Sequence, residues 1–123
     1  MKPNVITLCG STRFKKEYLE VTKWLTLQNN IVISVGLFGQ ADGDNLTKNE
    51  KIMLDKLHKQ KIDLANEIFV IDPEKYIGNS TKTEIEYALT HNIKIRYLHE
   101  EQHELAKWKS EFYNRKEIEN WNQ

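Results

Sequence analysis

Four short apolar runs, separated by longer stretches with helical periodicity, constrain the fold of this chain more than any other feature. The runs cover residues 5–9, 31–35, 68–71 and 93–98, and they are rich in the β-branched and aromatic residues of buried strands. Because strand and helix alternate along the sequence, the pattern is that of βαβ units and a parallel sheet. We predict an α/β fold: a Rossmann-like (flavodoxin-like), doubly wound parallel sheet of four or five strands with helices on both faces.

The stretches between the apolar runs place apolar residues three and four positions apart, as amphipathic helices do. Thr47 and Glu50 form a capping box that marks one helix start, while residues 36–46, with three glycines, are expected to be a loop of the kind that covers binding sites. Helices are expected at about 12–28, 47–65, 80–91 and 101–121.

Size and charge limit the classes of function that the chain can serve. Its 123 residues fit a single domain, 1–123, and 18 Lys and Arg cancel 18 Asp and Glu. Broad binding to a nucleic-acid polymer or to a membrane surface needs a surplus of positive charge, so neither partner is expected. Any anionic ligand must then be held by a few local groups.

The single cysteine, Cys9, cannot form an intramolecular disulfide, and it excludes metal sites built on several cysteines. The acidic segment 42–45 superficially suggests calcium, but Met53 stands where an EF-hand loop needs glutamate. We therefore expect no metal and no cofactor. Since no apolar run approaches the roughly 18–20 residues that span a bilayer, the expected location is cytoplasmic.

The first candidate binding segment follows the first strand and opens the first helix. Gly10 allows close backbone approach, Ser11 and Thr12 carry hydroxyls, and Arg13 can form paired hydrogen bonds with a phosphate. The spacing matches neither a P-loop nor a dinucleotide fingerprint. The same residues could also serve as an ordinary strand–helix turn.

The second candidate segment opens the helix expected at about residue 80. Ser80 or Thr81 can cap this helix and offer a hydroxyl to a ligand, and Thr81 with Glu84 forms a second capping box. Glu86 has no capping role, so it is either a solvated residue or a carboxylate held for chemistry. On the preceding helix, Asp55 and His58 share one face, a pattern that is typical of a charged surface.

Together these segments resemble the nucleoside 2-deoxyribosyltransferase superfamily, and within it the 2′-deoxynucleoside 5′-monophosphate N-hydrolases. The resemblance covers most of residues 4–98. Residues 9–13, Cys-Gly-Ser-Thr-Arg, follow the family's CGSxR turn, and Ser80 precedes Glu86 by six residues, as in its Ser…Glu motif. Residues 64–70 are similar to the family's ADxxV entry into a strand.

The resemblance implies that Glu86 is the catalytic carboxylate at the anomeric carbon and that Ser11, Arg13 and Ser80 hold a 5′-phosphate. His58 stands where the hydrolases have an aspartate, so it becomes the candidate acid, and Phe38 is expected to cover the base. A competing register, similar to the PGGxGTxxE motif of phosphoribohydrolases, makes Glu84 functional instead.

The expected function is hydrolysis or deoxyribosyl transfer at the N-glycosidic bond of a nucleotide or nucleoside. The alternatives are a nucleotide-binding module without catalysis and a protein that only binds other proteins. The resemblance also implies a homodimer. The C-terminal helix, with Trp108, Phe112 and Trp121, is either its contact surface or packs on the sheet.

Overall fold

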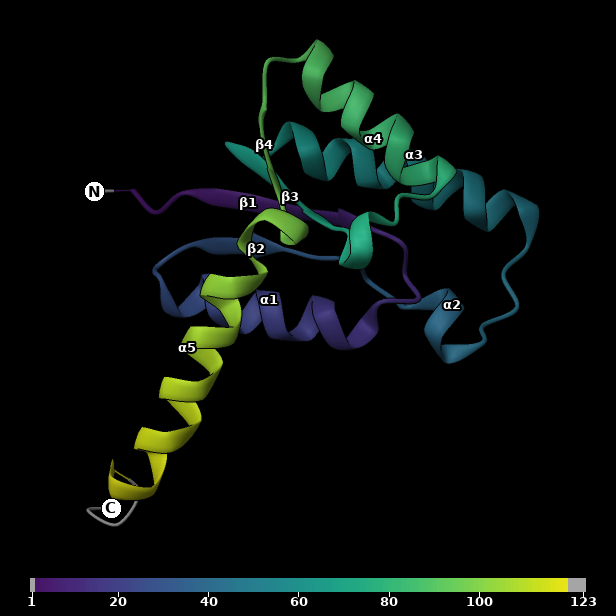
Figure 1. The fold of residues 1–123 in the computed structure, drawn as a ribbon. Helices are drawn as coiled ribbons and strands as arrows, with labels where there is room; N and C mark the ends of the chain where they lie inside the picture. Colours follow the sequence, from purple (N-terminus) through teal and green to yellow (C-terminus); the bar gives the residue numbers. More distant parts are fainter. Residues whose placement is uncertain (1, 120–123) are drawn as a thin grey trace.

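A computed structural model describes residues 2–119 and shows a four-stranded sheet in which every strand is parallel to its neighbours (Figure 1). The strands are β1 (Val5–Gly10), β2 (Ile31–Ile33), β3 (Glu67–Ile71) and β4 (Lys94–Tyr97). Their order across the sheet is β2-β1-β3-β4. The chain thus crosses from one side of β1 to the other after β2, which confirms the predicted doubly wound α/β fold.

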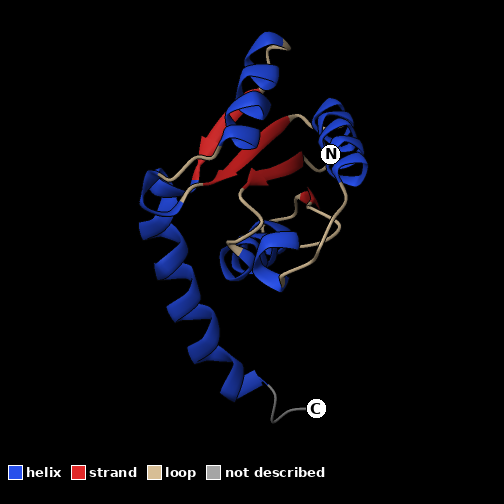
Figure 2. Cartoon of the chain, turned by 90° about the vertical axis from the view of Figure 1, so that its right-hand side faces the viewer, coloured by secondary structure: helices blue, strands red, loops and turns tan. Residues whose placement is uncertain are grey.

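The helices form a layer on each face of the sheet. Helices α1 and α5 lie on one face, and α3 and α4 lie on the other (Figures 1 and 2). The helices are α1 (Lys15–Leu27), the single-turn α2 (Gly39–Asp42), α3 (Lys48–Asp63), α4 (Asn79–Thr90) and α5 (Leu98–Glu119), with a 3₁₀ turn at Pro73–Lys75.

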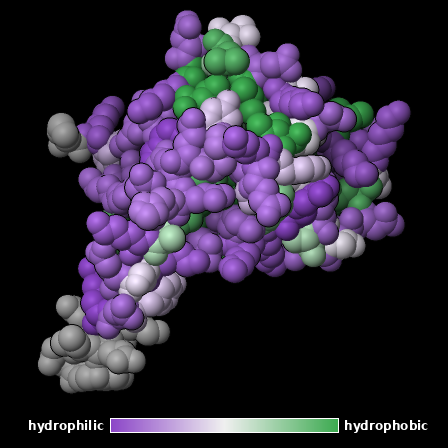
Figure 3. Space-filling model, viewed as in Figure 1, coloured by the Kyte–Doolittle hydropathy of each residue, from purple (hydrophilic) through white to green (hydrophobic). Residues whose placement is uncertain are grey.

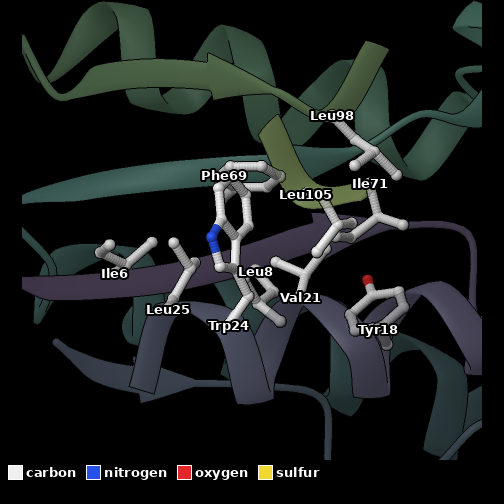
Figure 4. Packing of buried hydrophobic residues seen from close by; sticks show 10 residues of the cluster. All are labelled: Ile6, Leu8, Tyr18, Val21, Trp24, Leu25, Phe69, Ile71, Leu98 and Leu105. Atoms are coloured by element: carbon white, nitrogen blue, oxygen red, sulfur yellow. The ribbon is translucent and has the colours of Figure 1, made fainter. Parts of the chain in front are cut away.

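Successive side chains of the central strands point to opposite faces of the sheet, so these strands contribute to two hydrophobic clusters, one on each face. In β3, Phe69 and Ile71 belong to the cluster beneath α1 and α5, whereas Ile68 and Val70 belong to the cluster beneath α3 and α4. Figure 4 shows the larger cluster, in which side chains of β1 and β3 interleave with those of α1 and α5. Its members are Ile6, Leu8, Tyr18, Val21, Trp24, Leu25, Phe69, Ile71, Leu98 and Leu105.

Three predicted helix starts need correction. Helix α1 begins at Lys15, with Phe14 as its N-cap, rather than at about residue 12, so Ser11 and Thr12 lie in the turn before the helix. Helix α4 begins at Asn79 with Gly78 as its N-cap, so Thr81 lies inside the helix, is buried, and does not form the expected capping box with Glu84. Helix α5 begins at Leu98, directly after β4, rather than at about residue 101.

The first half of α5 packs on the body of the molecule. Leu98 and Leu105 are buried in the larger cluster, Trp108 packs against it, and Lys109 forms an ion pair with Glu20 of α1 at 2.7 Å. Figure 3 shows mostly hydrophilic side chains where this helix leaves the body. None of the helices in the described part has the length and apolar character needed to cross a membrane. Trp121 lies outside the described residues.

The predicted capping box at the start of α3 is confirmed. The Thr47 hydroxyl accepts from the Glu50 N–H at 3.1 Å, and the Glu50 carboxylate accepts from the Thr47 N–H at 2.9 Å. We expect Thr47→Ala to lower the free energy of unfolding by about 1 kcal/mol, because the Glu50 N–H loses the hydroxyl that accepts its hydrogen bond. Urea denaturation measures this. Thr26→Ala, at an exposed position of α1, is the control and should be close to neutral; equal losses in both variants would contradict the prediction.

Candidate functional site

A cavity of about 760 Å³ lies at the carboxyl edge of the sheet, where ligands bind in open α/β folds. Its walls come from the turn after β1, the loop after β2, one side of α3 and the start of α4, elements that meet at the right of Figure 1. Eight of its lining residues are among those singled out from the sequence: Gly10, Ser11, Thr12, Asp55, His58, Ser80, Thr81 and Glu84.

The turn after β1 depends on a glycine. Gly10 has φ +148°, and a Cβ built there would lie 2.7 Å from the carbonyl oxygen of Ile71 on the neighbouring strand. Glycine therefore lets β1 run close to β3 at the edge where the cavity opens. Ser11 and Thr12 follow immediately and carry their hydroxyls to the cavity wall.

A polar network links this turn to α2 in the 36–46 loop. The Ser11 hydroxyl donates to Oε1 of Gln40 at 3.1 Å, and Nε of Arg13 donates to the same oxygen at 3.2 Å. The Gln40 N–H donates to the Thr12 hydroxyl at 3.1 Å. Two donors from the turn thus converge on one acceptor oxygen, an arrangement that a phosphate oxygen could also accept.

Arg13 and Phe38 do not take the positions expected for them in the cavity. Arg13 lies at the rim, with its guanidinium 4.6 Å from the ring centroid of Tyr76, and it is not part of the lining. Phe38 is likewise absent from the lining, because it packs edge-on against Tyr18 of the larger cluster at 5.4 Å. Tyr76 is the aromatic side chain that lines the cavity instead.

Three buried polar side chains from three different elements meet beside the cavity. Cys9 of β1, His58 of α3 and Glu84 of α4 are between 0 and 9% exposed. Nε2 of His58 lies 3.4 Å from Sγ of Cys9 and 3.8 Å from Oε1 of Glu84. His58 and Glu84 also line the cavity, so a molecule or ion in the cavity can contact the cluster.

Burial shifts the pKa values of Glu84 and His58 in the directions that favour the neutral form of each side chain. Burial first and the negative charge of Asp55 second raise the pKa of Glu84 to about 7, against smaller opposing effects of Cys9 and Lys59. Burial and the positive charge of Lys61 lower the pKa of His58 to about 4. His58 is consequently neutral over the range in which Glu84 titrates, and the two side chains do not form an ion pair.

Glu86 needs correction as the candidate catalytic carboxylate. It is exposed and does not line the cavity, whereas Glu84 is buried on the cavity wall. Two residues along an α-helix turn the side chain by about 200°, so only one of these two glutamates can face the sheet. The competing register, with Glu84 as the functional residue, is the one that brings a carboxyl group to the cavity.

Sequence reasoning missed Cys9 and Gln40 as parts of the site. The sequence places Cys9 at the start of the CGSxR match and otherwise identifies it as a lone thiol without a role in the site, and Gln40 belongs to no motif. The period-two alternation of β1 contained a usable signal for Cys9, because it places this side chain on the face that α3 and α4 cover. No comparable signal exists for Gln40, whose place depends on the path of the loop.

Comparison with known proteins gives no family: no protein-family model, no curated protein and no solved structure matches the chain. The functional argument therefore depends on the chemistry of the site itself.

Proposed function

We propose that the chain binds a nucleoside 5′-monophosphate in this cavity and cleaves or transfers its N-glycosidic bond, with the carboxyl group of Glu84 acting on that bond. The observation that carries the proposal is the buried carboxyl group of Glu84 on the wall of the same cavity that the turn after β1 lines.

The phosphate end of the proposed ligand is suited to the start of α4 and to the turn after β1. The first residues of α4, Asn79–Thr81, and its N-cap Gly78 line the cavity, and free backbone N–H groups at a helix start favour anions. Hydroxyl groups of Ser11 and Ser80 add donors, and the side chains of Lys51 and Lys61 supply positive charge to the lining. One phosphate can thus be held although the chain has no net charge.

The reacting end needs a proton donor and a negative charge. When the bond between C1′ and the base nitrogen breaks, its electron pair goes to the base, which requires a proton, while positive charge develops on the sugar. The raised pKa of Glu84 supports its role as the donor, and Asp55, an exposed carboxylate in the same lining, can stabilise the sugar cation. Water or a second base then supplies the group that bonds to C1′.

His58 lies in the cavity as expected, but it fits a different role. Its pKa of about 4 makes it a poor proton donor near neutral pH. Since its Nε2 lies close to both Cys9 and Glu84, we assign it a positioning role beside the Glu84 carboxyl group.

Base release from matched pairs of deoxynucleoside monophosphates and deoxynucleosides tests the proposal. We expect free base from the monophosphates and much less from the nucleosides, detected by chromatography with a metal chelator present. Ser11→Ala should raise KM for the monophosphate about tenfold, because a hydrogen bond to a charged group is lost, and should leave reaction with the nucleoside unchanged.

Two other results of the same assay would contradict part or all of the proposal. Thermal stabilisation by monophosphates without release of base would contradict catalysis and support the non-catalytic binding module. No stabilisation and no release would contradict the nucleotide ligand altogether.

A further inference from the structure

The buried cluster of Cys9, His58 and Glu84 supplies a set of donor atoms that suits a metal ion, and the proposed nucleotide chemistry gives no role to its thiol. A thiol sulfur, an imidazole nitrogen and a carboxylate oxygen lie within 4.8 Å of one another. Their residues belong to β1, α3 and α4, so the fold, and not a local sequence motif, brings these atoms together.

The separations within the cluster are close to those of a tetrahedral zinc site. Zinc bonds sulfur at about 2.3 Å and nitrogen or oxygen at about 2.0–2.1 Å, so tetrahedral angles place such ligand atoms about 3.3–3.6 Å apart. Sγ of Cys9 and Nε2 of His58 are 3.4 Å apart, and Nε2 of His58 and Oε1 of Glu84 are 3.8 Å apart. Of these two distances only the second must shorten, by about half an ångström, and the third separation, from Sγ of Cys9 to the carboxylate oxygen of Glu84, lies within 4.8 Å.

The donor types select the metal. Calcium and magnesium prefer oxygen ligands, whereas a mixed set of sulfur, nitrogen and oxygen suits zinc. Charge also fits a buried site: the thiolate of Cys9 and the carboxylate of Glu84 together balance the two positive charges of the ion. The occupied cluster would carry no net charge, which reduces the free-energy cost of burying the ion.

An ion has both a route to the cluster and room for a further ligand. His58 and Glu84 line the cavity, so the ion can arrive through it. In the part of the chain that the structure describes, the cluster contains three potential ligands and no fourth. Three protein ligands with one open position are typical of zinc sites that exchange a ligand, in contrast to closed structural sites.

We propose that Cys9, His58 and Glu84 bind one zinc ion whose fourth coordination position opens into the cavity. Binding of the ion does not depend on the proposed nucleotide chemistry. If that chemistry also holds, zinc inhibits it, because the Glu84 carboxylate cannot be a ligand and donate a proton at the same time.

Cobalt(II), a spectroscopic substitute for zinc, tests the site without any nucleotide. Metal-free protein titrated with Co²⁺ should show a thiolate-to-cobalt charge-transfer band in the near ultraviolet and the strong visible bands of four-coordinate cobalt. Both should saturate at one ion per chain and disappear when Zn²⁺ is added. Cys9→Ala should abolish the charge-transfer band, and Glu84→Gln should weaken binding at least about tenfold. Glu86→Gln is the matched control, because Glu86 is exposed and lies about 200° around α4 from Glu84. This variant should bind Co²⁺ as the wild type does.

Three outcomes would overturn the site. They are folded wild-type protein with no charge-transfer band, unchanged affinity in Cys9→Ala, and equal losses in the Glu84 and Glu86 variants. Circular dichroism checks that each variant is folded, and Glu84→Gln carries the test if Cys9→Ala does not fold. Since base release is assayed with a chelator present, a failed zinc site leaves the nucleotide proposal standing, and a failed nucleotide proposal leaves this test unaffected.

Discussion

Glu84→Gln is expected to lower the rate of base release from a deoxynucleoside monophosphate by about two to four orders of magnitude, as loss of a positioned proton donor does. The substitution replaces the carboxyl group with an amide of nearly the same shape, so the cavity should keep its form. Binding of the monophosphate should change little, because the groups that would hold the phosphate lie at the turn after β1 and at the start of α4. Rate and KM measured together separate the two effects.

Glu86→Gln is the matched control for this experiment, since it makes the same chemical change two residues away on the same helix. Glu86 is exposed and outside the cavity lining, so we expect wild-type turnover. A large loss in the Glu86 variant with normal turnover in the Glu84 variant would contradict the assignment and restore the register first expected from the sequence.

The order of strands and helices could be predicted because each element leaves a local pattern. Continuous apolar runs mark strands buried on both faces, and β3 is buried along its whole length. Thr47 and Glu50 mark a helix start through a reciprocal pair of hydrogen bonds that needs only local geometry. Both features are formed by residues that are close together in the sequence, so they can be recognised without knowledge of the fold.

The identity of the buried carboxylate could not be predicted in the same way. The capping interpretation placed Thr81 before the helix, but Gly78 is the N-cap, and the helix therefore starts earlier than expected. The face that α4 turns toward the sheet depends on its packing, with Ala88 in the same buried stripe as Glu84. The helix start alone does not determine that rotation, so the sequence left open whether Glu86 is solvated or held for chemistry, and in the fold it is exposed.

The positions of Phe38 and Gln40 depend on contacts between distant segments. The glycine-rich composition of residues 36–46 predicted a loop near the site, but it could not predict which side chains the loop turns inward. Phe38 fills space beside Tyr18, and Gln40 is held by hydrogen bonds with Ser11, Thr12 and Arg13. The loop therefore joins the site through a polar link, and its aromatic residue belongs to the core.

Gly10→Ala is expected to be among the most destabilising single substitutions in the chain, although it adds only one methyl group. The backbone at Gly10 has φ +148°, a region that is essentially restricted to glycine, and the new Cβ would lie 2.7 Å from the Ile71 carbonyl oxygen. Relief requires β1 to move away from β3, where Gly10 and Ile71 are paired. We expect a loss of on the order of 3 kcal/mol in the free energy of unfolding and a fall of about 10 °C in Tm.

Two other glycines separate the possible causes of this loss. A Cβ at Gly36 would meet no atom within 4 Å and the residue has no positive φ, so Gly36→Ala should be neutral to within about 0.5 kcal/mol. Gly43 has φ +70°, and a Cβ there would also meet no atom within 4 Å. Gly43→Ala therefore measures the cost of backbone strain alone, which we expect to be about 1 kcal/mol in the free energy of unfolding. Chemical denaturation of the three variants therefore separates backbone strain from the clash with Ile71. If Gly10→Ala proved no less stable than Gly43→Ala, the close approach of the two strands would not be what requires glycine at the start of the proposed phosphate turn.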